Sequence, residues 1–441
     1  MSRSIRGRIA VITGIAVSVL FAPRPTLAQT SLQLPLQFDF LNPGAKSLAL
    51  GGAFAGLADD ATATFANPGG LTQLNASEFS IDLRHSQVST PFLAGGRLSG
   101  TITHEGLDTI QGPLFEDSVG THTGPGFIAG VYAHRSHKWV VAGYRHELVR
   151  VDQSFLATGV FQKDPAELTS RREFPQLGQR AVSVTGYGGS GAIVVRPGIS
   201  VGGAITAYTF ALRSTFERLD TVGFLGPPVL DPPRGVATQN GDGTRLAPTI
   251  GGLLSYGPVR VGIVYRHGAS FDITTADGTG AVRSGEFRVP NTTGAGVSIR
   301  AFGAMTVASE VTYVSYGRLR EDFVTDQARG SGRVDSFTID SATEVHVGVQ
   351  YARPQWWGLP RFRGGSWFDP DHSVQYTSPG PGLFPSDRLF DERLSVALST
   401  GRDRWHVSAG IGLTFGTHVE FNAGFDRASQ SRIFSSSLIL R

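Results

Sequence analysis

The sequence predicts an all-β fold, a transmembrane antiparallel β-barrel of about 14 strands with an N-terminal hatch inside the lumen. Three observations lead to this prediction. Apolar and polar residues alternate with a period of two from about Ser77 onward. Short and long connections alternate between these segments along the chain. After the N-terminus no run of about 18 apolar residues occurs, so no segment is suited to cross a bilayer as a helix.

The composition agrees with such a barrel and excludes several other classes of protein. Charged residues make up 17% of the 441 residues, below the roughly 25% of soluble domains. The net charge of +3 is dispersed, and a nucleic-acid interface would need clustered basic residues. Cysteine is absent, which excludes disulfides, thiolate metal sites and a cysteine nucleophile.

The first 28 residues have the pattern of a removable export signal. Arg3, Arg6 and Arg8 give a positive start, and an apolar stretch of suitable length runs from Ile9 to Phe21. Small residues then offer a cleavage site after Ala28. The alternative is an N-terminal membrane anchor. It would need a longer apolar stretch, whereas the stretch here is closed by Pro23 and Pro25.

The alternation is clearest between residues 405 and 415. One face carries Trp405, Val407, Ala409, Ile411, Leu413 and Phe415, and the other carries His406, Ser408, Gly410, Gly412 and Thr414. In a soluble sandwich the apolar face would lie inside, whereas in an outer-membrane barrel it contacts lipid and the polar face lines the lumen. We therefore expect arginine at position 411 to prevent folding and serine at position 410 to be tolerated.

Counting back from a periplasmic C-terminus gives fourteen strands. They are expected at 430–441, 417–427, 404–416, 359–369, 334–353, 303–320, 286–301, 258–274, 245–256, 199–217, 178–196, 138–157, 125–134 and 77–88. The long loops fall near 89–123, 158–177, 218–244, 275–285, 321–333 and 370–403, all at one end, as a barrel requires. The apolar stretch 92–104 is assigned to the first of these loops, and a helix start is expected at 164–167.

Residues 29–76 show no sustained alternation and are expected to form a hatch, or plug, inside the barrel. Exposure of this segment would leave large apolar side chains in water, namely Phe38, Phe40, Leu48, Leu50, Phe54 and Phe65. Burial of each is worth roughly 1.5–3 kcal/mol, which favours a compact segment in the lumen. The barrel proper is then residues 77–441.

No motif indicates an enzyme, a cofactor or a metal site. The glycines between Gly186 and Gly191 match G-x-G-x-x-G but lie inside an alternating strand, whereas a dinucleotide site needs a strand-to-helix turn. Asp59-Asp60 suits a turn, and the two acids and one histidine within 367–372 are weak evidence for a metal. Glu310, His346 and His406 are expected to line a wet lumen.

The stretch from Gly44 to Ala63 leads to Asn67-Pro68-Gly69. This N-terminal segment resembles the hatch of the long-chain fatty-acid transporter (FadL/TodX) family of outer-membrane proteins, which has Asn-Pro-Ala at the last three positions. Later similarities are 289–297, 346–351 and 363–367. Gly69 departs from the family's alanine, and the chain ends on Arg441 where barrels usually end on an aromatic residue. PorV-like barrels, which serve protein secretion, carry the same hatch motif.

The resemblance implies uptake of hydrophobic small molecules, such as long-chain fatty acids or aromatic hydrocarbons, through a loop groove and a gap in the wall. The possible groove residues are Phe155, Leu156, Val160, Phe161, Leu168 and Phe174, and Gly143 is the possible wall kink. The alternative is a non-transporting barrel that scaffolds or shuttles exported proteins. A continuous apolar path from loops to lumen would favour uptake, and a flat exposed loop face would favour scaffolding.

The expected surroundings follow from this placement in the cell outer membrane. They are outer-membrane lipid and lipopolysaccharide around the barrel, a hydrophobic small-molecule ligand, and the barrel assembly machinery during insertion. We expect a monomer and no nucleic-acid partner.

Export should remove residues 1–28 and leave Gln29 as the mature N-terminus, because the small-residue site precedes it. N-terminal sequencing of the protein from isolated outer membranes checks this expectation. A chain that retains Met1 in that fraction would contradict the export signal.

Overall fold

The computed structural model describes residues 40–163, 170–173, 175–277, 280–301, 304–324, 334–353, 355–380 and 385–441. The expected export signal, Phe38, the helix start at 164–167, Leu168 and Phe174 lie outside these ranges.

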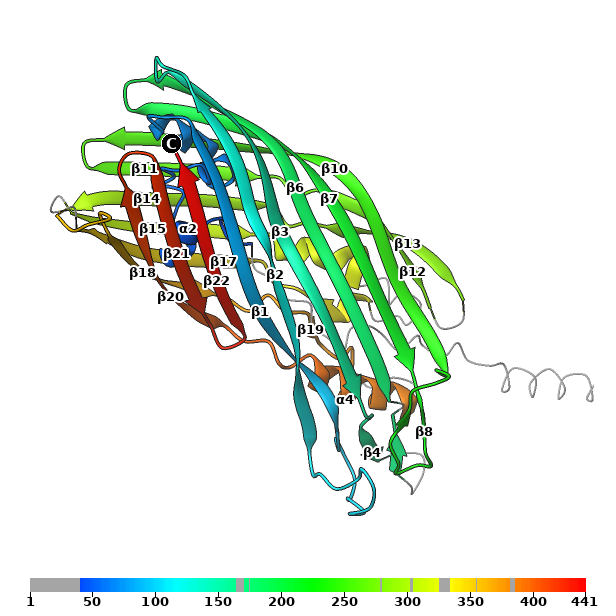
Figure 1. Cartoon of the computed structure of the whole chain (residues 1–441). Coiled ribbons are helices and arrows are strands. Elements are labelled where there is room, and N and C mark those ends of the chain that lie inside the picture. Colours follow the sequence, from blue (N-terminus) through cyan, green and yellow to red (C-terminus); the bar gives the residue numbers. More distant parts are fainter. Residues whose placement is uncertain are drawn as a thin grey trace, which may run out of the picture.

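One antiparallel sheet forms the whole wall and closes on itself (Figure 1). Its segments are β1 (Glu78–Gly96), β2 (Pro113–Ala133), β3 (Trp139–Ala157), β6 (Gln176–Arg196), β7 (Ile199–Arg218), β10 (Gly235–Tyr256), β11 (Val259–Arg266), β12 (Ser270–Ala276), β13 (Val282–Arg288), β14 (Thr292–Ala301), β15 (Met305–Val314), β17 (Ala342–Ala352), β18 (Arg361–Asp369), β20 (Arg404–Phe415), β21 (Val419–Arg427) and β22 (Ser431–Leu440). Strand β22 pairs with β1 and completes the barrel. Because β11 with β12 and β13 with β14 are single strands broken in the middle, the wall has fourteen strands, as predicted.

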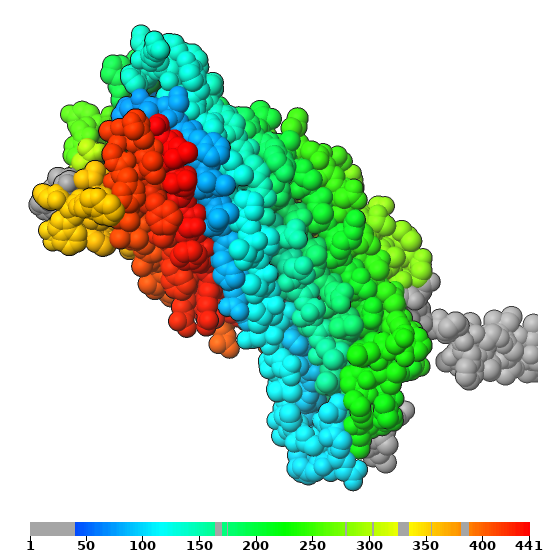
Figure 2. Space-filling view, viewed as in Figure 1, coloured from blue at the N-terminus to red at the C-terminus, as the bar shows by residue number. Residues whose placement is uncertain are grey.

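The two sides of the wall differ in height. Strands β1, β2, β3, β6, β7 and β10 are 19–22 residues long, whereas β15, β17, β18, β20, β21 and β22 are 9–12. About 9–11 residues suffice to span a bilayer. The tall side therefore projects beyond it, most clearly as the β1–β2 hairpin (Figures 1 and 2). The expectation that 89–123 is all loop was wrong, since its two ends continue β1 and β2.

The outer surface of the barrel carries an apolar belt. On β20, Trp405 and Val407 are 67% and 64% exposed, while His406 and Ser408 between them are buried inside. Ile193, Ile250 and other large apolar side chains are exposed in the same way on the other strands. An exposed apolar belt on a closed barrel is the lipid-facing surface of an outer-membrane protein.

Tight turns join the strands at the end opposite the projecting hairpin. Gly198, Gly257 and Gly416 adopt the left-handed conformation in three of them, with φ of 79°, 56° and 61°. These turns were expected from the sequence. None of the helices in the described residues is long and apolar enough to cross a membrane.

The N-terminal segment lies inside the barrel, as predicted. It contains helix α2 (Ala45–Ala49), helix α3 (Ala63–Ala66) and the 3-10 helix η2 (Pro68–Gln73). Leu48, Leu50, Phe54 and Phe65 are at most 3% exposed, and Phe40 is half-buried against Tyr316. The lumen is thus filled by the hatch.

Short elements cover the other mouth of the barrel. They are β4 (Phe161–Lys163), β5 (Ser170–Arg172), β8 (Asp220–Thr221), β9 (Pro228–Val229), β16 (Phe337–Thr338), β19 (Gln375–Tyr376), the turns η3 (Tyr316–Leu319), η4 (Arg320–Val324) and η6 (Val334–Ser336), and helix α4 (Pro385–Ala397). At this mouth, helix α4 contacts strand β1.

Two strands that were expected to be continuous, 258–274 and 286–301, are each broken. A Cβ atom at Gly268 would overlap the carbonyl oxygen of Val289, so the two breaks face each other. Pro290 cannot donate a ladder hydrogen bond. The Asn291 side chain instead accepts from the Gly268 amide at 2.8 Å.

Arginine in place of Ile411 should prevent folding into vesicles, because a charge near the bilayer midplane of a barrel costs roughly 2–4 kcal/mol. The matched control is Gln179→Arg, an outward and already exposed position on the projecting part of β6. Electrophoretic mobility before and after heating reports the folded fraction. Equal folding of both variants would mean that the outward face at 411 does not contact lipid.

Candidate functional site

The hatch is fixed to the wall by Asn67 and its neighbours. The Asn67 side chain donates to the carbonyl oxygens of Ala55, at 2.8 Å, and of Gly252 on β10, at 3.0 Å. Its Oδ1 accepts from the Gly69 amide at 3.1 Å, which caps η2. A Cβ at Gly69 would lie 2.8 Å from the Gly252 Cα. Glycine in place of the family's alanine therefore lets the hatch turn approach β10 more closely.

On the neighbouring strands β14, β15 and β17, polar side chains bind the backbone of the hatch. Glu310 accepts from the amides of Phe54 and Ala55 at 2.8 and 2.7 Å. His346 Nδ1 lies 2.8 Å from the Gly51 carbonyl oxygen, and Ser298 donates to that of Gly56 at 2.9 Å. Glu310 and His346 were expected to line a wet lumen. Instead both are buried, because they replace water as partners of the hatch backbone.

Glycines make this close approach possible. At seven inward-facing positions a Cβ would overlap atoms of the hatch; together they form the glycine seat, and they are Gly202, Gly251, Gly262, Gly348, Gly365, Gly410 and Gly424. At Gly410 the Cβ would lie 2.5 Å from the Ala49 Cβ. The expectation that serine is tolerated there was therefore wrong, because the sequence alone does not show which lumen positions touch the hatch.

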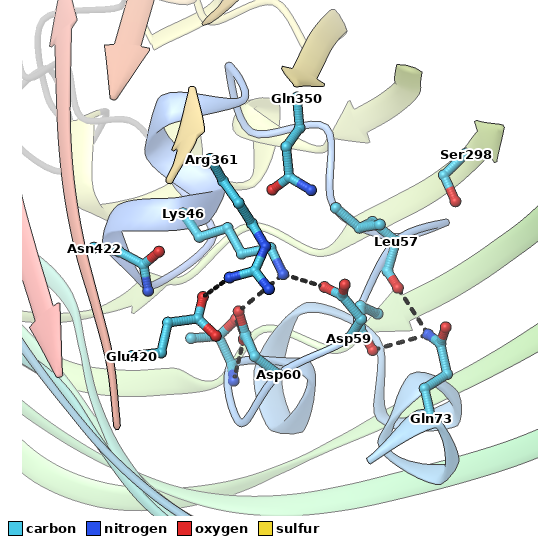
Figure 3. A network of polar contacts seen from close by, with 12 residues as sticks. Lys46, Leu57, Asp59, Asp60, Gln73, Ser298, Gln350, Arg361, Glu420 and Asn422 are labelled. Atoms are coloured by element: carbon cyan, nitrogen blue, oxygen red, sulfur yellow. Dashed lines mark hydrogen bonds and ion pairs between the residues drawn. The ribbon is translucent and has the colours of Figure 1, made fainter. Parts of the chain in front are cut away.

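A charged network closes the hatch end of the lumen (Figure 3). Lys46 Nζ lies 2.5 Å from Asp59 and 3.7 Å from Asp60. Arg361 approaches Glu420 at 3.8 Å, and the C-terminal Arg441 binds Glu420 at 2.9 Å. Burial raises the pKa of Asp60 above its usual value, and the charge of the neighbouring Lys46 offsets only part of this shift. Asp59-Asp60 thus links two parts of the hatch through Lys46, and the network is the polar part of the plug.

The other end of the lumen is apolar. Phe210 stacks on Phe271 at 4.7 Å and on Phe287 at 4.8 Å, and Phe287 meets Phe323 edge-on at 5.0 Å. Val182, Val184, Leu212 and Ile273 are buried in the same cluster. The expectation of a polar lumen thus holds for β15 to β21 but not for the tall side, where the loops and hatch exclude water.

The buried apolar cluster is continuous from the hatch to the covered mouth. It includes Phe65 and Leu71 of the hatch, the phenylalanines above it, and Leu394 and Leu398 at helix α4. The buried apolar cluster therefore extends from the covered mouth to the hatch.

The wall has an opening between β2 and β3. The ladder between them ends at the pair Phe127–His146, and Leu148 is an extra residue in the β3–β6 ladder. We call residues 121–126 and 147–151 the β2–β3 window. His122 Nε2 and Glu147 Oε1 lie 3.0 Å apart across it. Gly143, the expected kink, pairs regularly with Gly130 and Gly189, so the irregularity begins four residues later.

A cavity of about 80 Å³ lies behind the β2–β3 window. Its lining includes Leu148, Val149 and Val151 of β3 and also Leu41, Val88, Ile433, Arg84 and Arg404. The window thus opens into the lumen between apolar and basic side chains. No signal in the sequence distinguishes this extra residue from a regular strand.

The four groove residues that the structure describes do not form one surface. Phe155 packs on Phe92 and Phe216, at 5.1 and 6.0 Å, while Leu156 is exposed. Val160 packs with Leu93 and Ala397.

Phe161 lies between the guanidinium groups of Arg97 and Arg172, at 5.3 and 5.2 Å from its ring centre. Leu168 and Phe174 lie outside the described residues. The described members of the groove set therefore belong to separate loop clusters.

Several acids and histidines of the lumen pair with one another or with arginine. His406 lies 2.7 Å from Asp426 and stacks on Trp367, and Asp369 binds Arg404. His372 stacks on Tyr316 at 3.8 Å. In the part of the chain that the structure describes, no three such side chains gather as a metal site.

Comparison with known proteins shows the fold. No protein-family model matches the chain, and no curated protein has a similar sequence. The crystal structure of a FadL homologue from Pseudomonas aeruginosa aligns with a TM-score of 0.60 at 13% identity, covering 91% of this chain and 99% of that one. The toluene transporter TodX of P. putida aligns with a TM-score of 0.52 at 12% identity, covering 91% and 99%. The chain has the fold of these barrels.

Alanine in place of Gly348 should loosen the hatch, because the added methyl group overlaps the Leu50 carbonyl oxygen. Overpacking of this kind costs about 1–3 kcal/mol. We expect a lower unfolding temperature and faster proteolysis of the hatch. Gly143→Ala is the matched control, since its Cβ meets nothing within 4 Å. If both variants match the parent, the glycine seat does not constrain the hatch.

Proposed function

We propose that this chain, a hatch-plugged barrel with the fold of FadL-type transporters, takes up apolar small molecules across the outer membrane. The observation that carries the proposal is the continuous apolar lining between helix α4 and the hatch. A solute that leaves water for this lining gains about 0.8 kcal/mol for each buried CH₂ group. Such a path is what distinguishes uptake from a scaffolding role.

The barrel meets a physical need of such solutes. They cross the polar saccharide layer of an outer membrane poorly, and the tall wall raises the loop-covered mouth above the bilayer. Between the mouth and the hatch the lining is phenylalanine, valine and leucine. Long-chain fatty acids and aromatic hydrocarbons both suit such a lining, and mass spectrometry of lipids that co-purify with the protein would distinguish them.

The β2–β3 window supports a sideways exit. The charged network around Lys46 and Glu420 opposes straight passage of an apolar solute through the hatch end. The window opens at the level where the outward residues of β3 change from Trp139 and Val141 to Arg145 and Glu147. A solute leaving there enters the outer leaflet near its headgroups. In this proposal the hatch blocks ions, and the window releases the solute.

Deletion of residues 29–70 should leave a folded barrel, because the wall ladder closes without the hatch. Ion conductance across a planar bilayer should rise at least tenfold, and selective uptake of apolar solutes should be lost. Single-channel recording and uptake into cells that lack other apolar transporters measure the two effects. A deletion variant that conducts no more than its parent would show that the segment is not a plug.

A further inference from the structure

The wall is also interrupted between β10 and β12. Strand β10 pairs with β11 over Thr249–Tyr256 and with β12 only over Thr238–Asn240. Between these ladders, residues 241–248 face residues 267–273 with a single backbone bond, from the His267 amide to the Pro248 carbonyl oxygen at 3.0 Å. We call these two stretches the β10–β12 gap.

The sequence builds this gap into the wall. In an antiparallel strand the amide and carbonyl of one residue point to the same neighbour. Since the Pro248 carbonyl points to His267, the missing proline N–H removes a ladder bond on that side. Gly268 follows, where only glycine fits against Val289. A small movement of the backbone therefore cannot restore a regular hydrogen-bond ladder between β10 and β12.

Arg245 passes through the gap. It pairs with Tyr208, which is buried in the lumen, and directly opposed residues point to the same face of a sheet. Nevertheless the Arg245 side chain is 52% exposed and lies 2.7 Å from Asp272, which is 79% exposed. Asp272 faces outward, because its neighbours Phe271 and Ile273 are buried inside. The guanidinium thus leaves the lumen side and closes the gap from outside.

The aromatic lumen lies directly behind the gap. Gly241 and Gly243 are inward positions in the upper part of the gap, so β10 adds no side chain to the barrier at these two positions. A Cβ at Gly241 would lie 2.7 Å from the Ile273 side chain, 2.8 Å from the Asp272 carbonyl oxygen and 3.0 Å from Phe210, and one at Gly243 would lie 3.9 Å from Phe271. The stacked phenylalanines therefore lie directly behind the two glycines and the β12 backbone at Asp272.

The gap lies at the upper edge of the apolar belt. Ile250 just below the gap and Leu246 in its lower part face outward, and Thr244 and Asp242 do so in its upper part. Unpaired backbone is costly in the hydrocarbon core but can be hydrated at the headgroups. An ion pair as exposed as Arg245–Asp272 is also weak. Both facts allow the gap to open without large cost.

We propose that the β10–β12 gap is a second lateral portal, closed by the Arg245–Asp272 latch, through which apolar small molecules pass between the aromatic lumen and the outer leaflet. The proposal rests on the proposed uptake function, to which it adds a second route, separated from the β2–β3 window by strands β3, β6, β7 and β10. It assigns Arg245 as a gating residue and the stacked phenylalanines as the inner end of the route.

The absence of cysteine allows each opening to be locked by itself. The double variant R245C/D272C, bridged by a short bis-methanethiosulfonate reagent, locks the portal, and reduction releases it. H122C/E147C locks the β2–β3 window. T209C/T244C is the matched control on the intact β7–β10 ladder, where the two hydroxyl oxygens are 3.4 Å apart.

The readout is labelling of the lumen by a diazirine-bearing C16 hydrocarbon dissolved in phosphatidylethanolamine and phosphatidylglycerol vesicles that contain the folded protein. After illumination, mass spectrometry measures label on Phe271 and Phe287. The portal lock should lower this label at least fivefold, and reduction should restore it. The window lock and the control bridge should change it less than twofold.

Three results would overturn the portal: label that the R245C/D272C bridge does not change, label that only the window lock removes, or no label on Phe271 and Phe287 in any variant. Uptake of oleate and naphthalene is measured on the same preparations. If the labelling behaves as expected while neither probe is taken up, the portal stands and the proposed uptake function fails. If uptake proceeds without label at these residues, the function stands and the portal fails.

Discussion

The arrangement of this barrel depends on direct contact between the backbone of the hatch and the backbone of the wall. Side chains normally hold two such layers about 10 Å apart, and the glycine seat removes them on the wall side. Backbone groups of the hatch thereby come within reach of the wall side chains Glu310, His346 and Ser298. In the other direction, the hatch residue Asn67 reaches the carbonyl oxygen of Gly252 on the wall. The hatch is therefore held by many directional bonds, and its polar backbone is satisfied without water.

The same contact divides the lumen into two chemical environments. Near the hatch end, charges such as Lys46, Asp59 and Glu420 neutralise one another around the α2 segment. Toward the mouth, the tall strands and the loops bury Phe210, Phe287 and their neighbours as a protein core would. An apolar solute is thus stabilised on one side of the hatch and opposed on the other. Openings in the wall become the routes of least resistance.

Much of this fold follows from the sequence. Apolar and polar residues alternate along fourteen segments, and in a closed barrel this alternation means that the apolar face of each strand points to the lipid. The fourteen strands were predicted on that basis, and the burial of the hatch was predicted from its large apolar side chains and its lack of alternation. The breaks at Gly268 and Pro290 were not, since each looks like an ordinary residue within an alternating run. Likewise, the alternation shows which residues lie on the same face of the sheet, but not whether that face contacts the hatch, the loops or water. For this reason serine was expected to be tolerated at Gly410, Glu310 was expected to face water, and the apolar part of the lumen was not predicted. The irregularity of β3 was expected at Gly143, whereas the extra residue is Leu148.

The unequal strand heights give the molecule two parts of different local stability. Strand β22 pairs with β1 only as far as Val88, so the last eight residues of β1 have β2 as their sole ladder partner. An isolated two-stranded ribbon is marginally stable in water. Here it gains support from Gln153, which donates to Thr90 at 2.9 Å, and from Phe155, which packs on Phe92. Loss of those contacts would let the ribbon unzip down to the seam while the barrel below stayed closed, so its amide protons would exchange through local opening and those of the barrel only through global unfolding.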